Sequence, residues 1–276
     1  MVKKVYGVIG DPIEHSLSPV MHNAAFEALG LDAIYLAFRV AEHELGDAIR
    51  GAKSLGIAGL NVTIPLKEKA LAFVDADDVA TRIGAINTIA FTSGTPTGYN
   101  TDGIGALTVL KERVREIRGK EVLILGAGGA ARAIAFYLDA EGARLTIANR
   151  TEDRAAMLAS SLHNADFISL REEELKRHIR DADILINTTP VGMYPRADAT
   201  LVNARMMHPE LVVFDIVYNP AETKLLREAK KAGVQTIIEG VKMLVYQGAA
   251  SFRIWTGMKP PVEVMESAVR KALSLS

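Results

Sequence analysis

The sequence of 276 residues contains no cysteine, and this absence excludes several kinds of chemistry. Without a thiol the chain can form no disulfide, thiolate zinc site, iron–sulfur cluster or thiol nucleophile. Net charge is also nearly absent, because 32 Lys and Arg residues oppose 33 Asp and Glu residues. Since no basic excess is available to hold a polyphosphate, we expect neither nucleic acid nor an anionic membrane as a partner.

Long apolar runs and metal-binding patterns are missing as well. No run approaches the ~20 residues of a membrane helix, and the first residues lack the apolar region and cleavage site of a secretory signal. We therefore expect a cytoplasmic protein. The histidines have neither a metal-ligand spacing nor a helical i, i+4 pairing, so we expect no bound metal. They are His15, His22, His43, His163, His178 and His208.

Short β-type runs alternate with helical segments in the first hundred residues. The runs Val5–Ile9, Ala33–Phe38 and Gly59–Val62 are separated by the helical segments Pro19–Leu29 and His43–Ser54. Such alternation predicts βαβ units around a mainly parallel sheet.

A second series of strands starts near residue 121. The runs Glu121–Leu125, Arg144–Ala148, Asp183–Ile186 and Leu211–Phe214 are apolar almost throughout. This pattern is typical of strands buried on both faces of a doubly wound sheet. Because one core rarely grows much beyond about 250 residues, we expect two α/β domains.

Helical segments are expected beside these strands. The segment from Asp102 to about Arg118 is predicted to form a helix that ends in Gly119. The last stretch, 241–276, is predicted to be helical on both sides of Lys259-Pro260-Pro261, since proline breaks one helix and can start the next.

A glycine-rich loop directly follows the strand 121–125. Its sequence, Gly126-Ala127-Gly128-Gly129-Ala130-Ala131, has the form G-x-G-x-x-A and leads into a helical segment. In this context the glycines permit a tight turn and the approach of a pyrophosphate to the backbone. The sequence therefore predicts a dinucleotide site at the start of that helix.

The end of the next strand indicates which dinucleotide is bound. An NAD site usually has an acid there for the ribose 2′-hydroxyl, whereas this chain has Asn149 and Arg150, with Arg154 one helical turn further. A guanidinium can bind the 2′-phosphate of NADP. We therefore predict NADP as the cofactor. The alternative is that Arg150 is an ordinary solvated charge.

Four polar motifs lie at the predicted strand ends of the first half. Amides and hydroxyls of this kind suit a small ligand with several hydroxyl groups. Lys67 and Asp102 are the acid–base candidates among them, and which of the two transfers a proton is left open. Each motif also has a structural alternative as a helix cap or turn. The motifs are Ser16-Leu17-Ser18-Pro19, Asn61 to Lys67, Asn87-Thr88 and Asn100-Thr101-Asp102.

Taken together, these motifs resemble the shikimate dehydrogenase family along nearly the whole chain. Further motifs add to the resemblance, and they are Asn149-Arg150-Thr151, Asn187 to Met193, Tyr218-Asn219-Pro220 and Gly240 to Gln247. The resemblance implies an enzyme that reversibly reduces 3-dehydroshikimate to shikimate with NADPH, in aromatic amino-acid biosynthesis. It also implies a substrate domain at 1–103, completed by helices at 241–276 that fold back onto it, and a Rossmann-type NADP-binding domain at 104–240.

The resemblance also implies roles for individual residues. Lys67 would be the acid–base residue, beside Asp102. Substrate would be bound by Ser16, Ser18, Thr63, Lys67, Asn87, Asp102, Tyr218 and Gln247. NADP would be bound by Gly126, Ala127, Gly128, Gly129, Ala130, Asn149, Arg150, Thr151, Arg154, Ile216, Gly240 and Asp78.

Two other functions fit parts of the same sequence. A quinate/shikimate dehydrogenase that uses NAD would share Lys67 and Asp102 but would not need Arg150. A noncatalytic protein that senses such metabolites would not need a proton-transfer pair. The oligomeric state is left open, with a homodimer as one option.

Overall fold

Two six-stranded sheets organise the chain in a computed structural model, which describes residues 3–92 and 94–274. One compact unit extends to Gly105 and includes the chain from Val245 onward, and the other comprises Ala106–Leu244. We call them the first and the second unit. A two-domain α/β fold was predicted, and it is confirmed.

The sheet of the first unit has the strand order β2-β1-β3-β5-β6-β4. β5 is antiparallel to both of its neighbours, and every other adjacent pair is parallel. The prediction of a mainly parallel sheet is therefore confirmed. The strands are β1 (Lys4–Gly10), β2 (Ala33–Arg39), β3 (Gly59–Val62), β4 (Asp75–Ala76), β5 (Thr88–Ala90) and β6 (Thr97–Tyr99).

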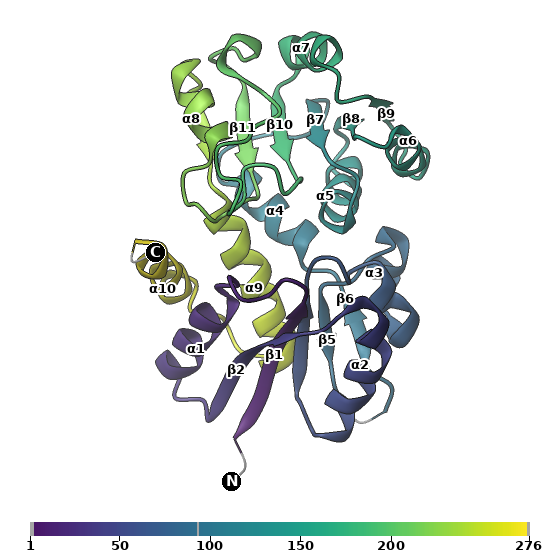
Figure 1. The fold of residues 1–276 in the computed structure, drawn as a ribbon, viewed down its shortest axis with the longest axis vertical. Helices are drawn as coiled ribbons and strands as arrows, with labels where there is room; N and C mark the ends of the chain where they lie inside the picture. Colours follow the sequence, from purple (N-terminus) through teal and green to yellow (C-terminus); the bar gives the residue numbers. More distant parts are fainter. Residues whose placement is uncertain (1–2, 93, 275–276) are drawn as a thin grey trace. The chain divides into compact units, whose positions relative to one another are not determined.

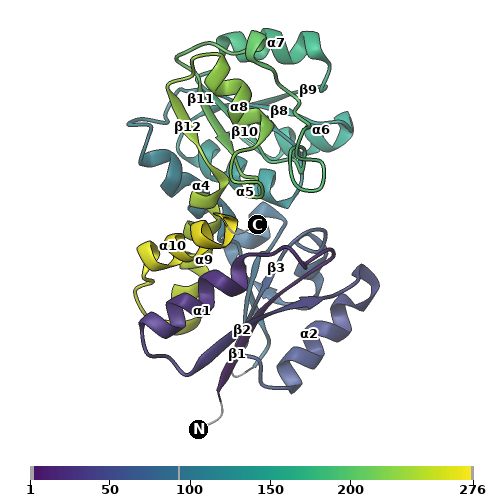
Figure 2. The same cartoon turned by 60° about the vertical axis from the view of Figure 1, so that its left-hand side comes forward.

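Helices cover both faces of this sheet (Figure 2). α1 (Ser18–Ala28), α10 (Val262–Ser274) and the part of α9 (Gly240–Thr256) from Val245 onward lie on one face, and α2 (Leu45–Ser54) lies on the other. The two terminal helices therefore fold back onto the first unit, as predicted.

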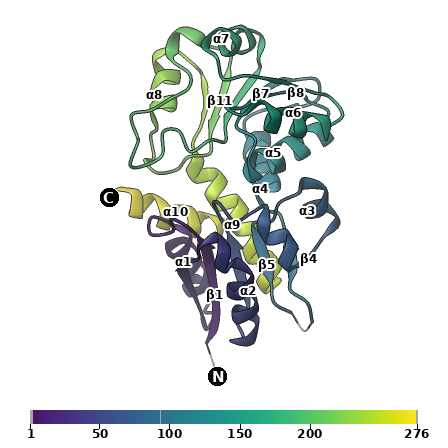
Figure 3. The same cartoon turned by 45° about the vertical axis from the view of Figure 1, so that its right-hand side comes forward.

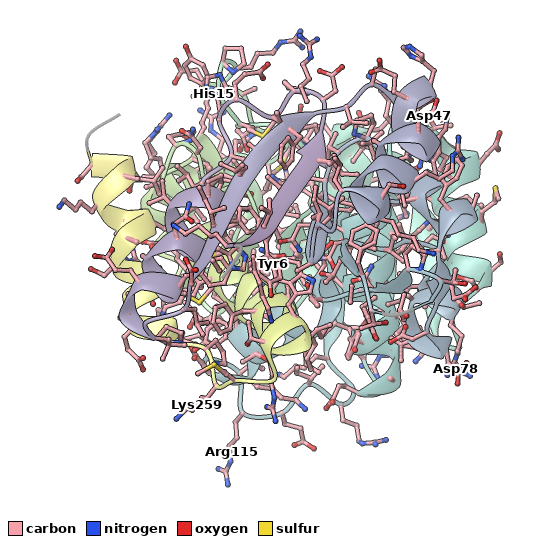
Figure 4. All side chains as sticks on the ribbon, turned by 90° about the horizontal axis from the view of Figure 1, so that it is seen from below. Tyr6, His15, Asp47, Asp78, Arg115 and Lys259 are labelled. Atoms are coloured by element: carbon pink, nitrogen blue, oxygen red, sulfur yellow. The ribbon has the colours of Figure 1, made fainter. Side chains whose placement is uncertain are left out.

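Side chains of adjacent strand residues alternate between these two faces, as the geometry of a strand requires. Tyr6 of β1, labelled in Figure 4, is buried and packs against Trp255 of α9, with ring centroids 5.2 Å apart. Leu60 of β3 faces the opposite way and packs in one cluster with Leu45 and Ile49 of α2. The unit therefore has an apolar layer on each side of its sheet.

The sheet of the second unit has the order β12-β11-β10-β7-β8-β9 with all pairs parallel. In chain order this is the 3-2-1-4-5-6 arrangement of dinucleotide-binding sheets, so the predicted doubly wound sheet is confirmed. The strands are β7 (Glu121–Leu125), β8 (Arg144–Ala148), β9 (Ala165–Ile168), β10 (Ile184–Asn187), β11 (Val212–Asp215) and β12 (Thr236–Ile238).

The helices of the second unit cover both faces of this sheet as well. α5 (Gly129–Ala140) and α6 (Glu152–Ser160) lie along β7 and β8 (Figure 3). α7 (Glu172–Asp181) and α8 (Lys224–Lys231) share one apolar cluster with Leu123, Leu185 and Val213, and both helices are seen in Figure 1. Ile124 and Ile186, which neighbour these strand residues, are also fully buried, as expected of strands covered on both faces.

The helix predicted from Asp102 to Arg118 is wrong in its length. α4 (Asp102–Lys111) ends seven residues earlier. The following turns bury both Val114 and Ile117 and lead the chain into β7, where the N–H of Gly119 donates to the carbonyl of Gly142 at 2.8 Å. Gly119 has a positive φ, so it forms part of this turn and not the cap of α4.

Several elements were not predicted. They are β4, β5, β6, β9, β12, α3 (Asp78–Ile83), α7, α8 and the short 3-10 helices η1 (Glu42–Glu44), η2 (Lys69–Phe73) and η3 (Ala204–Met206). Among residues 3–92 and 94–274, no helix is long and apolar enough to cross a membrane. Within the same residues, no group of three His, Cys, Asp or Glu side chains could hold a metal ion. The cytoplasmic location and the lack of a metal remain predictions.

Candidate active site

Most of the predicted substrate residues lie at one edge of the first unit's sheet. Thr63 and Lys67 follow β3, and Asp102 lies three residues after the end of β6. Because β5 is antiparallel to its neighbours, its first residues begin at this same edge, and Asn87 directly precedes it. Open α/β sheets place their ligands at the carboxyl ends of their strands.

Lys67 and Asp102 form an ion pair at this edge. The Lys67 Nζ lies 2.5 Å from the Asp102 Oδ2, and the two side chains are 16% and 4% exposed. The aspartate side chain is therefore almost removed from water, whereas the lysine side chain keeps some exposure through which a ligand could reach it. This arrangement can hold or move a proton next to a bound hydroxyl or carbonyl group.

Asn87 joins the second oxygen of this carboxylate to Gln247. The Asn87 Nδ2 lies 2.9 Å from the Asp102 Oδ1 and 3.2 Å from the Gln247 Oε1. Asn87 itself is buried. Lys67, Asp102, Asn87 and Gln247, which are far apart in the sequence, are thus brought together as a connected polar group.

Gln247 reaches this group because two helices approach each other closely. A Cβ on Gly105 of α4 would lie 2.8 Å from the backbone nitrogen of Gln247 in α9, which is too close for any other residue. On a neighbouring side of α9, a Cβ on Gly248 would lie 2.2 Å from the Met21 side chain of α1. Glycine at both positions therefore lets α9 pack against its neighbours in the first unit.

Among the remaining predicted substrate residues, Ser16 and Ser18 are joined to each other by a hydrogen bond. Ser18 is buried at the first position of α1, and its N–H lies 3.4 Å from the Ser16 Oγ in the loop after β1. Thr63 is partly exposed after β3, with its methyl group beside Gly10. Within the described part of the chain, no hydrogen bond joins these three side chains to Lys67 or Asp102, although they come from neighbouring strand ends. Tyr218 belongs to the second unit.

The glycine-rich loop of the second unit has the local geometry of a dinucleotide site. Gly126 has φ +110°, and a Cβ there would lie 2.5 Å from the Thr188 Oγ1, so only glycine fits. A Cβ on Gly128, which precedes α5, would meet nothing within 4 Å, so a ligand could approach its backbone. The first turn of α5 carries no acid. The region around Gly126, Ala127, Gly128, Gly129 and Ala130 therefore fits a pyrophosphate.

Asn149, Arg150, Thr151 and Arg154 surround the start of α6. The Asn149 Nδ2 donates to the carbonyl of Thr151 at 2.9 Å, and both arginines are exposed. The first turn of α6 also contains two carboxylates, those of Glu152 and Asp153. The prediction of a cationic 2′-phosphate site did not include these acids.

Ile216 and Gly240 lie close together in the second unit. A Cβ on Gly240 would lie 2.7 Å from the carbonyl carbon of Ile216, so the start of α9 packs directly on the segment after β11. Asp78 lies elsewhere, exposed as the first residue of α3 in the first unit (Figure 4). It is therefore the one predicted cofactor residue that does not belong to the second unit.

The hydroxyl groups of Thr88, Thr101 and Ser251 form a buried cluster next to Asn87. Thr88 and Thr101 belong to predicted motifs, but Ser251 does not. Ser251 lies one helical turn after Gln247, so an i, i+4 relation in the predicted helix could have indicated it.

Family models of shikimate dehydrogenase match most of the chain. The model of the shikimate dehydrogenase substrate binding domain matches residues 8–89. The model described as shikimate / quinate 5-dehydrogenase matches residues 108–233. The model of the shikimate 5'-dehydrogenase C-terminal domain matches residues 240–270.

Individual relatives are similar over their whole length. The chain is 55% identical to the shikimate dehydrogenase (NADP(+)) of Methanosarcina mazei, over 99% of both chains. The solved shikimate 5-dehydrogenase of Thermus thermophilus, in complex with NADP(H) and shikimate, is 39% identical with a TM-score of 0.89, over 98% of this chain and 100% of that chain. The quinate dehydrogenase of Corynebacterium glutamicum, in complex with NAD, is 29% identical with a TM-score of 0.88, over 98% and 99% of the two chains.

Proposed function

Because the chain belongs to the shikimate dehydrogenase family, we propose that it catalyses the reversible, NADPH-dependent reduction of 3-dehydroshikimate to shikimate. This oxidoreductase activity is a step in the biosynthesis of chorismate and the aromatic amino acids. The observation that carries the proposal is the Lys67–Asp102 ion pair at the ligand-binding edge of the first unit's sheet. A ketone that receives a hydride must also receive a proton, and this pair can supply it.

We assign different tasks to the two units. The first unit, predicted at 1–103 and 241–276, binds substrate, and the second, predicted at 104–240, binds NADP. Bound NADPH supplies the hydride. Ser16 and Ser18 hold the substrate carboxylate, and Thr63, Asn87 and Gln247 hold its hydroxyls. Tyr218 is proposed as a further substrate residue. Because Asn87 and Asp102 are buried, no mobile water shell surrounds their polar atoms, and these atoms can orient the hydroxyl groups of the substrate.

Lys67 and Asp102 act as the acid–base pair. In the direction of reduction, one proton passes from the pair to the oxygen of the former carbonyl group, and in the reverse direction the pair accepts it. The Asp102 Oδ1 accepts from Asn87 while its Oδ2 faces Lys67, so the carboxylate orients the ammonium within the site. General acid–base catalysis of this kind contributes about 10²–10⁴ in rate.

The cofactor residues are proposed from the second unit. The backbone from Gly126 to Ala130 holds the pyrophosphate, Asn149 to Arg154 hold the adenosine end with its 2′-phosphate, and Ile216 and Gly240 lie along the nicotinamide end. Asp78 is proposed as a further contact. The open space beside Gly128 and the acid-free first turn of α5 support this assignment.

A quinate/shikimate dehydrogenase that uses NAD is kept as a second candidate. Two observations favour it, namely Glu152 and Asp153 beside Arg150 and the similarity to a quinate dehydrogenase solved with NAD. Arg150 remains the feature that favours NADP. A homodimer is proposed as the assembly.

Product identification tests the proposed activity. Purified protein is incubated with 3-dehydroshikimate and NADPH, and shikimate is quantified by chromatography against the NADPH consumed. We expect equimolar conversion. Folded protein that binds shikimate but converts neither compound would instead indicate a noncatalytic metabolite sensor.

A further inference from the structure

Ser251 of α9 is fully buried, and its hydroxyl meets three polar side chains from other parts of the first unit. The Ser251 Oγ lies 3.0 Å from the Asn61 Nδ2, 2.7 Å from the Thr88 Oγ1 and 3.1 Å from the Thr101 Oγ1. These partners come from β3, from the start of β5 and from the segment after β6. One hydroxyl thus connects three strand ends to the helix that carries Gln247.

These contacts exceed what the burial of a serine requires. A helical serine satisfies itself by donating to the carbonyl four residues earlier, and Ser251 lies 3.1 Å from the Gln247 carbonyl oxygen. The three partners also have other hydrogen bonds, because Asn61 donates to the Asn87 carbonyl and both threonine hydroxyls lie within 3.0 Å of the Asn87 Oδ1. Removal of the Ser251 hydroxyl would therefore leave none of them unsatisfied.

The hydroxyl cluster meets the active site at the side-chain amide of Asn87. The backbone N–H of Thr101, which can only donate, lies 2.8 Å from the Asn87 Oδ1, and this contact fixes which end of the amide is oxygen. The amide nitrogen must then face Asp102 and Gln247. The Thr88 hydroxyl lies 2.9 Å from the same oxygen, whereas the Thr101 hydroxyl lies 3.0 Å from that oxygen and 2.8 Å from the amide nitrogen. Ser251 contacts both hydroxyls and so limits the positions that they can take.

We propose that Ser251 is a positioning residue of the active site, which acts through Thr88 and Thr101 on the amide of Asn87 and thereby on the Asp102 carboxylate. This inference rests on the proposed function, since Asn87 and Asp102 are substrate-binding and acid–base residues there. Among the described residues, Ser251 itself makes no hydrogen bond to Asp102 or Lys67. Its effect is to keep the amide aligned during turnover, because buried polar networks set geometry as a unit.

A double-mutant cycle on Ser251 and Asn87 tests this role. Ser251→Ala is expected to lower kcat/KM for shikimate about tenfold, as misplaced site groups do, and to leave KM for NADP+ and the unfolding temperature nearly unchanged. The matched control is Thr256→Ala, which also removes a hydroxyl of α9 that donates four residues back, here to Phe252. The control is expected to change kcat/KM less than twofold.

The cycle separates positioning from an independent effect. If Ser251 acts through Asn87, the double variant Ser251→Ala with Asn87→Ala has the same kcat/KM as Asn87→Ala alone, because coupled residues are not additive. A double variant that loses a further tenfold would overturn the proposal. An equal loss in Ser251→Ala and Thr256→Ala would also overturn it, since the cause would then be the helix in general.

A second measurement does not depend on turnover. The side-chain amide signal of Asn87 is followed by NMR in the full chain, with Asn-selective ¹⁵N labelling. It is expected to shift in Ser251→Ala and to stay in place in Thr256→Ala, and an unchanged signal in Ser251→Ala would refute the positioning role. If the wild-type chain converts no shikimate, the proposed function fails, while the amide signal still decides on Ser251.

Discussion

At the residue scale, the sequence motif that contains Lys67 could not decide whether this lysine is an acid–base residue or a surface charge. A lysine before a helical turn could be a solvated surface charge, although the positive end of a helix is a poor place for a cation. The structure pairs it with Asp102, a residue 35 positions away, and keeps it mostly buried. The motifs named both residues, but only the folded sheet edge brings them together, since β5 and β6 were not predicted.

Replacement of Lys67 tests its chemical role. Lys67→Ala is expected to lower kcat by about 10² or more, the size of a lost acid–base group, with a much smaller change in KM for shikimate. Steady-state kinetics with saturating NADP+ measure both constants. Lys69→Ala, at an exposed lysine that pairs with Glu42, is the matched control. Comparable losses in kcat and in binding would mean that Lys67 is chiefly a binding group.

Arg150 is the residue proposed to select the cofactor, and its replacement tests this proposal at the same scale. Arg150→Ala is expected to raise KM for NADP+ at least tenfold, as the loss of a charge-assisted contact to phosphate would, and to leave KM for NAD+ almost unchanged. Arg180→Ala, at an exposed arginine of the second unit that pairs with Asp181, is the control. An equal change for both cofactors would show that Arg150 does not recognise the 2′-phosphate.

At the scale of elements, the strands that could be predicted are those with a recognisable run of β-type residues, namely β1, β2 and β3 in the first unit and β7, β8, β10 and β11 in the second. β7, β8, β10 and β11 form apolar runs, and their predicted bounds are within one residue of the observed ones. The strands that were missed are two to four residues long, and three of them, β4, β9 and β12, lie at sheet edges. Their conformation depends on pairing with a neighbour, which no local pattern records.

α1 packs against β2 and buries His22, which belongs to none of the predicted polar motifs. His22 is fully buried and stacks on Tyr35 of β2 at 4.4 Å between ring centroids. Neither ring nitrogen has a hydrogen-bond partner among the residues that the structure describes. Burial lowers the pKa of His22 from 6.5 to about 3, so the imidazole is neutral in the folded protein.

This burial makes the free energy of unfolding depend on pH. The pKa is lower in the folded state, so the unfolded chain binds the proton more readily, and stability is lost as pH falls below about 6.5. At pH 5.5 the loss from this group is about 1.4 kcal/mol. His22→Phe is expected to remove that part of the pH dependence in urea unfolding at pH 7.5 and 5.5. His43→Phe, at an exposed site, should not, and an unaltered dependence in His22→Phe would contradict this account.

Asp215, at the end of β11, is a buried carboxylate, and it makes stability depend on pH in the opposite direction to His22. Asp215 accepts from the Asn187 Nδ2 at 2.9 Å, the Val217 N–H at 3.0 Å and the Thr223 hydroxyl at 2.6 Å. Burial outweighs these bonds and raises the pKa of Asp215 from 3.8 to about 6. Through these bonds Asp215, the last residue of β11, is connected to the last residue of β10 and to two residues that follow β11.

Because the pKa of Asp215 is higher in the folded state, its contribution to stability is complete below pH about 4 and is lost as pH rises through about 6. The buried charge then costs on the order of 3 kcal/mol. Asp215→Asn keeps an acceptor oxygen but cannot ionise, so its stability relative to the wild type should rise between pH 4 and pH 8. Asp198→Asn, at an exposed carboxylate of the same unit, is the control. A pH-independent difference for Asp215→Asn would contradict the shifted pKa.

At the scale of the whole molecule, the first unit is built from both ends of the chain. Val245 onward completes it with Gln247, Ser251 and Trp255, although the second unit, Ala106–Leu244, intervenes in the sequence. Composition and periodicity allowed this return but could not require it, and only the resemblance to a family predicted it. The second unit is continuous, and its glycine loop and doubly wound sheet could be predicted from local pattern.

The most direct test of the whole account is a comparison of initial rates with purified protein, in which shikimate and quinate are each combined with NADP+ and NAD+. The account predicts strong turnover with shikimate and NADP+ and little with the other three pairs. Preferred turnover of quinate, or equal rates with NAD+, would contradict the assignment of substrate or cofactor. No turnover with any pair, in protein shown to be folded, would contradict the proposed catalysis itself.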